Sequence, residues 1–217
     1  MFLGHFGVAF AAKKAAPSVS LGVLVAAAQF ADLLWPVLLL AGLEQVAIDP
    51  GNTAVTPLDF MHYPWSHSLA MLTLWGVVFG AGYRLLRGGS WRVAALIALV
   101  VVSHWGLDVL VHRPDMPLTP AEQVKLGLGI WNSVPATVAL ELVVFAAGLA
   151  LYAGMTRARD RIGRYAVGGL VAFLLVIYAA NVLGPPPPSV AAIAWTCIAM
   201  WLLVAWAGWI DRHRESK

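Results

Sequence analysis

Charged residues are scarce in this chain, since Asp, Glu, Lys and Arg together make up only 12% of its 217 residues. Soluble domains carry about twice that share. Hydrophobic residues make up 60% of the chain, and the mean hydropathy is +0.79. A soluble fold of this composition would lack the polar residues for its surface, whereas a bilayer removes that requirement. The composition therefore predicts an integral membrane protein.

Cysteine is also nearly absent. The single residue, Cys197, lies in an apolar run, so no internal disulfide can form and the redox compartment cannot be read from the sequence. The net charge of +3 is small and gives no reason to expect a nucleic-acid partner. Lys13 and Lys14 follow the first apolar stretch instead of preceding it, which is not the pattern of a cleaved signal peptide.

Six apolar runs are long enough to cross a bilayer as helices. They cover residues 18–43, 67–86, 91–111, 134–154, 162–183 and 189–210. A shorter apolar segment, residues 2–12, would reach only about 17 Å as a helix, so we expect it to lie at the interface or to re-enter halfway. The predicted fold is all-α, a polytopic bundle of about six transmembrane helices plus this short N-terminal helix.

We treat residues 1–217 as one integral membrane domain. Residues 1–145 bear the candidate site, and residues 162–210 add two apolar spans. Lys and Arg gather in every second connection, whereas the loops 44–66, 112–133 and 184–188 hold only Arg113 and Lys125. The positive-inside rule then predicts a multi-pass protein of the inner (plasma) membrane with both termini in the cytoplasm.

Ionisable residues inside the apolar runs are the candidates for chemistry. His104, Asp108 and His112 are spaced by four along the third span and share one helical stripe. An ionisable group in the hydrocarbon region costs about 3 kcal/mol or more unless it is paired or liganded. Two such groups one turn apart therefore favour a functional site over chance.

Four other segments place similar residues at a comparable depth. His62 and His67 lie where the second span opens, Asp32 lies in the first span and Glu141 in the fourth. His5 belongs to the short first segment and reaches this depth only if that segment re-enters. Histidine and carboxylate together are ligands for zinc and similar divalent ions, and catalytic zinc lowers the pKa of water toward about 7.

Each residue also has a structural explanation. A single histidine in a membrane is about as often a packing group as a ligand, Asp32 can solvate a kink at Pro36, and His62 can be a loop residue. His112 can belong to an exposed turn, and Glu141 can orient a histidine. We expect His5, Asp32, His67, His104 and Asp108 to be metal ligands. His62, His112 and Glu141 are the candidates for a general base or a supporting partner.

At these residues the sequence resembles the inner-membrane metal-dependent hydrolases, a membrane-bound family called LexA-binding in enteric bacteria. The resemblance lies in Gly4-His5, in the aspartate of Ala31-Asp32-Leu33, in His62-x4-His67-Ser68 and in Ser103-His104-x3-Asp108. It covers about residues 1–145 and implies a metal-dependent hydrolase. The family's second aspartate is missing after Asp32, which removes a ligand for a second or third metal ion.

The sequence thus predicts a membrane-embedded, metal-dependent hydrolase, most simply a zinc enzyme, acting on a phosphoester or lipid-like substrate near the outer face. Its partners would be membrane lipids and a small-molecule or lipid substrate, with no nucleic acid. An ion-coupled or metal transporter using the same residues is the alternative, although spans five and six contain no Asp, Glu, Lys, Arg or His between Tyr165 and Ile210. A non-catalytic scaffold with a relic site is a third interpretation.

Overall fold

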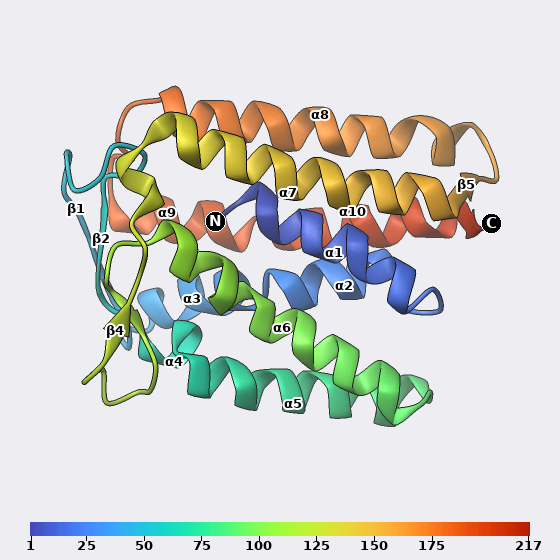
Figure 1. The fold of residues 1–217 in the computed structure, drawn as a ribbon, viewed down its shortest axis with the longest axis horizontal. Coiled ribbons are helices and arrows are strands. Elements are labelled where there is room, and N and C mark those ends of the chain that lie inside the picture. The colour runs from blue at the N-terminus through green and yellow to red at the C-terminus, as the bar shows by residue number, and fades with distance from the viewer.

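The computed structural model describes all residues, 1–217, as an all-α bundle, as predicted (Figure 1). Its helices are α1 (Leu3–Ala15), α2 (Leu21–Ala28), α3 (Phe30–Leu40), α4 (Pro64–His67), α5 (Leu69–Arg87), α6 (Trp91–Val111), α7 (Val134–Met155), α8 (Arg161–Leu183), α9 (Val190–Ile198) and α10 (Trp201–Arg212). Three short antiparallel strand pairs join β1 (Gln45–Ile48) to β2 (Leu58–His62), β3 (Met116–Pro117) to β4 (Lys125–Leu126) and β5 (Thr156–Ala158) to β6 (Arg214–Ser216).

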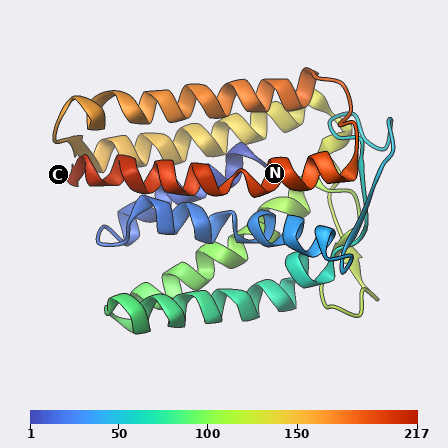
Figure 2. The ribbon, with the colours of Figure 1, turned by 180° about the vertical axis from the view of Figure 1, so that it is seen from behind.

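Five helical segments are long and apolar enough to cross a membrane. Four of them are α5, α6, α7 and α8, which match the predicted spans closely. The fifth runs from Val190 to Arg212 and contains both α9 and α10, which lie in one line across the back of the bundle (Figure 2). Multi-pass membrane character is therefore supported by the structure as well as by composition.

The first predicted span, residues 18–43, is broken in the structure. α2 and α3 meet at Gln29 with a bend of 57°, and together they form the sixth candidate span. The kink lies before Asp32, not at Pro36, which is inside α3. The last carbonyl groups of a helix have no partner within the helix. The break therefore leaves backbone acceptors in the middle of the bundle.

The short N-terminal helix α1 lies inside the bundle and not at the membrane interface. Figure 1 shows it running between α7, α2 and α6, with its first residue at mid-depth. Met1 is buried there, away from either end of the bundle, while Lys13 at the other end of α1 pairs with Asp211 of α10 at 2.8 Å. Of the two expected placements, penetration to half depth is the one observed.

Two glycines allow α1 to lie directly against α7. A Cβ on Gly148 would stand 1.9 Å from the carbonyl oxygen of Gly7, and a Cβ on Gly7 would stand 2.5 Å from that of Val144. Only glycine permits such close backbone approach. This contact fixes the position of α1 and, with it, of His5.

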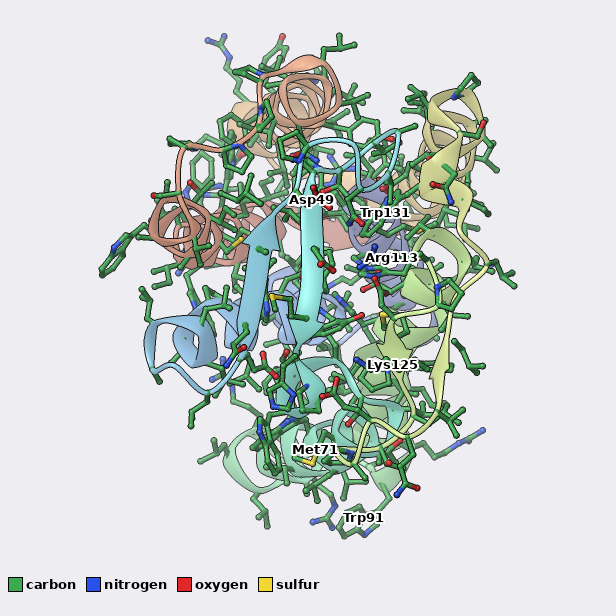
Figure 3. All side chains as sticks on the ribbon, turned by 90° about the vertical axis from the view of Figure 1, so that its left-hand side faces the viewer. Asp49, Met71, Trp91, Arg113, Lys125 and Trp131 are labelled. Atoms are coloured by element: carbon green, nitrogen blue, oxygen red, sulfur yellow. The ribbon has the colours of Figure 1, made fainter.

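The two ends of the bundle differ in chemistry. The β1–β2 hairpin and the β3–β4 loop lie across one end, which we call the cap end (Figure 3). At the opposite end, the basic end, lie the α1–α2, α5–α6 and α7–α8 connections and the C-terminus (Figure 1). These connections and the helix turns beside them carry most of the Lys and Arg residues of the chain.

The contact between α1 and α7 generates a first prediction. Gly148→Ala should force the two helices apart and lower stability by about 1–3 kcal/mol, because its Cβ has no room. Gly154→Ala, on the same helix but with no atom within 4 Å of its Cβ, should unfold at or slightly above the wild-type temperature. Thermal unfolding in detergent compares the two variants, and equal midpoints would contradict the close packing.

Candidate metal centre

Five predicted ligands meet in the middle of the bundle, below the cap end. The helix break places Asp32 in the first turn of α3, and His67 is the last residue of α4. His104 and Asp108 project from one face of α6, one turn apart, while His5 comes from α1. All except Asp32 are almost fully buried. Residues separated by up to about 100 positions in the sequence thus form one cluster.

The first group of candidate ligands is formed by Asp32, His67 and His104. Oδ1 of Asp32 lies 3.5 Å from Nε2 of His67 and 3.8 Å from Nε2 of His104. Ligands that bind zinc tetrahedrally at about 2.0–2.1 Å lie about 3.3–3.4 Å apart. The observed separations are close to this ligand–ligand distance, so these three atoms can contact one small cation with little movement.

Backbone geometry fixes the tautomer of His104. Its Nδ1 lies 2.8 Å from the carbonyl oxygen of Ala28, the last residue of α2. A carbonyl only accepts, so Nδ1 carries the hydrogen, and in the neutral ring the lone pair is on Nε2. Nε2 is buried without a hydrogen-bond partner, although Oδ2 of Asp108 is only 3.1 Å away.

A lone pair facing a carboxylate oxygen at that distance is repulsive unless a cation or proton lies between them. His104 Nε2 faces two carboxylates in this way, those of Asp32 and Asp108. Buried polar groups without partners are rare in folded proteins and require an explanation. A divalent cation satisfies the nitrogen and offsets both negative charges, so the residues fit a metal ion.

The second group consists of His5, His104 and Asp108. His5 stacks on His104 with ring centroids 3.7 Å apart and ring planes only 4° from parallel. Its Nε2 lies 3.1 Å from Oδ1 of Asp108, and the same carboxylate oxygen accepts from the Met1 amino group. The charge of Asp108 is thus already partly balanced, whereas Asp32 forms no bond to an ammonium or guanidinium group. The first group is therefore the better candidate for a bound ion.

Glu141 supports the cluster from α7. Its carboxylate accepts from the backbone N–H of Phe2 at 2.9 Å and from that of Gly4 at 2.8 Å. The first N–H groups of a helix lack partners within the helix, and a negative charge beside them is favourable. Glu141 therefore holds the start of α1, and thereby His5, instead of reaching the group around His104.

His112 lies above Asp108 on the cap side. Its Nδ1 is 2.9 Å from Oδ1 of Asp115, which leaves Nε2 free at 3.9 Å from Oδ2 of Asp108. The hydroxyl of Tyr63 donates to the same oxygen of Asp115 at 3.0 Å. Burial and the nearby Asp115 raise the pKa of Tyr63 well above its usual value, so the hydroxyl stays protonated as a donor. The ring of Trp131 packs on His112 with centroids 4.0 Å apart.

His62 is not brought into the cluster. It ends β2, and its half-exposed ring bonds Glu122 of the loop between β3 and β4. Four residues separate it from His67, but Tyr63 is not helical and α4 turns the chain inward only afterwards. Its side chain therefore joins the two cap segments at the surface, which corrects its assignment as a candidate base.

Three residues of the site carried no predicted role: Glu44, Ser66 and Asp115. Ser66 contacts both Glu44 and His67, and Asp115 orients His112. Glu44 lies in the predicted loop 44–66, and no periodicity marks it as buried. Ser66 was detectable only as the neighbour of a predicted ligand.

Comparison of the chain with family models, with curated proteins and with solved structures finds no match. The candidate site is therefore interpreted from its geometry.

Metal analysis of purified protein provides the second prediction. Wild-type protein should retain about one zinc ion per chain, and His104→Ala should retain none because His104 belongs to both ligand groups. His67→Ala should also lose the ion, whereas His5→Ala should retain it, because His5 does not belong to the first group. His213→Ala, whose ring pairs with Asp160 on another part of the surface, serves as the control. Absence of zinc from the wild type after zinc loading would refute the metal centre.

Proposed function

We propose that this chain is a membrane-embedded zinc-dependent hydrolase that acts on a phosphoester or lipid-like substrate near the outer face. The observation that supports this most directly is the pair of imidazole Nε2 atoms, from His67 and His104, that face the carboxylate of Asp32. This donor set is typical of zinc sites that retain a position for substrate or water. The sequence resemblance to inner-membrane metal-dependent hydrolases agrees with the proposal.

The residues divide the work between holding the ion and moving protons. Zinc, when bound, supplies Lewis acidity that polarises a phosphoryl or acyl oxygen and makes water more acidic. Asp32, His67 and His104 hold the ion. His112 is the candidate proton acceptor, because its Nε2 is unprotonated and faces the cluster while Asp115 fixes the ring.

The location of the site favours a substrate that partitions into the membrane. The ligands lie among helices with apolar surfaces, and the β1–β2 hairpin lies across the cap end. Asp32 is the ligand with the most accessible side chain, at 24% exposed against 4% for His67 and 0% for His104. Approach beside α3, at membrane depth, suits a lipid better than a soluble ester.

The orientation belongs to the same proposal. With the basic end in the cytoplasm, the cap end faces outward and the site lies in the outer half of the membrane. The C-terminus and the Lys13 end of α1 are then cytoplasmic, whereas Met1 lies buried inside the bundle, which differs from the prediction that both termini are in the cytoplasm.

One observation favours transport as the second candidate. The break between α2 and α3 beside the ligands is typical of transporters, which form ion sites from discontinuous helices. However, α1 fills the half of the bundle between the site and the basic end. Its residues Phe6, Ala9 and Phe10 have no accessible surface. This packing leaves no polar path to the basic end, so the hydrolase is preferred.

Reconstitution into vesicles provides the third prediction. Zinc-loaded protein should hydrolyse a fluorescent phospholipid in the bilayer, and Asp32→Asn should reduce the rate at least 100-fold by weakening the metal site. His213→Ala should retain the wild-type rate. Zinc uptake measured in the same vesicles tests the alternative. Zinc uptake without hydrolysis would favour the transporter over the hydrolase. Absence of both activities would refute both proposals.

A further inference from the structure

We infer that Glu44, acting through the hydroxyl of Ser66, selects the tautomer of His67 that can bind the metal. This inference rests on the proposed metal centre, because it assigns a positioning role toward one of its ligands. Glu44, Ser66 and His67 are buried, at 2%, 0% and 3% exposed. No sequence pattern suggests that Glu44 contacts Ser66, because the two residues are far apart in the chain.

Three hydrogen bonds link Glu44, Ser66 and His67. Oε1 of Glu44 accepts from the backbone N–H of Ser66 at 2.8 Å, and Oε2 accepts from the hydroxyl of Ser66 at 2.6 Å. Oγ of Ser66 in turn lies 2.6 Å from Nδ1 of His67. The chain therefore runs from the carboxylate through one hydroxyl to the imidazole.

The direction of the bonds follows from counting hydrogens. Serine has one hydroxyl hydrogen, and the carboxylate of Glu44 takes it because an ionised carboxylate only accepts. Oγ of Ser66 is then left as an acceptor for His67, so Nδ1 carries the hydrogen. Nε2, which faces Asp32, is left with a lone pair. The same reasoning holds for His104, where a backbone carbonyl plays the part of Ser66.

The environment of Glu44 favours the hydrogen-bonded connection from its carboxylate through Ser66 to His67, which we call the relay. Glu44 forms no salt bridge, although burial of a carboxylate without a cation is costly. Its two bonds to Ser66 satisfy one lone pair on each oxygen but do not supply positive charge. A cation bound at His67, two hydrogen bonds away, supplies it. Such outer partners orient metal-binding histidines and increase their basicity.

Replacing Glu44 by glutamine should reverse the chain without changing its shape. The amide oxygen must keep accepting from the N–H of Ser66, so the amide NH2 occupies the place of Oε2 and donates to Oγ. The hydroxyl hydrogen of Ser66 then has Nδ1 of His67 as its nearest acceptor, which favours donation from Ser66 to His67. The imidazole hydrogen is then favoured at Nε2, where it competes with a metal ion.

Zinc affinity and histidine tautomer are the two measurements of the fourth prediction. Competition with a zinc chelator should show that Ser66→Ala weakens binding about 10–100-fold, the usual effect of removing such a partner. Glu44→Gln should weaken it further, although it is the more conservative change. Adding Ser66→Ala to Glu44→Gln should restore binding to the level of Ser66→Ala alone, because Nδ1 is then free of the imposed donor.

Ser68→Ala is the matched control. Ser68 lies on the other side of His67 and is equally buried, but its hydroxyl caps α5 by accepting from the N–H of Met71. Loss of this cap should reduce thermal stability and leave zinc affinity unchanged. Ser66→Thr, which keeps a hydroxyl at the same place, should bind zinc nearly as tightly as wild type.

Nitrogen-15 NMR of histidine-labelled, metal-free protein separates the possible failures. The wild type should show His67 protonated at Nδ1, and Glu44→Gln should show it protonated at Nε2. If the wild type binds no zinc but the tautomer switches as expected, the metal centre fails and the relay stands. If zinc binds and Glu44→Gln has wild-type affinity and the wild-type tautomer, the relay is refuted and the metal centre stands.

Discussion

Nε2 of His104 occupies the point at which α1, α3, α4 and α6 bring their ionisable side chains together. This nitrogen is buried, carries a lone pair and faces the carboxylates of Asp32 and Asp108. In a low-dielectric interior this arrangement is costly, because Nε2 of His104 has no hydrogen-bond partner and faces negative charge. A cation reverses the sign of every one of these interactions. The surrounding helices hold the cluster where a cation can do this.

Much of the bundle serves to bring backbone and side chains to that point. The break between α2 and α3 supplies the Ala28 carbonyl that orients His104, and it places Asp32 on the first turn of the second half. The half-depth helix α1 delivers His5, and Glu141 holds its N-terminus. The C-terminal end of α2 and the N-terminal end of α1 thus lie inside the bundle, where their free backbone groups bond His104 and Glu141.

The two sides of the candidate site differ in polarity. Between the site and the basic end, α1 packs aromatic and small residues with no accessible surface. Toward the cap end, the groups are polar and only partly buried, with Arg113 bonding Asn52, Asp59 and Asp115 around the hairpin (Figure 3).

The amino-acid sequence predicted the long apolar helices and the five residues that meet in the central cluster. Apolar runs of about 20 residues have one stable arrangement in a bilayer, so α5 to α8 were predictable from composition alone. His104 and Asp108 were predictable because ionisable groups in such runs are costly, and a spacing of four fixes their common face. Tertiary structure alone decided the rest. It buried α1, set the break at Gln29, excluded His62 and connected Glu44 to His67. These features depend on contacts between segments distant in the sequence, and local periodicity carries no information about which loop folds back onto which helix.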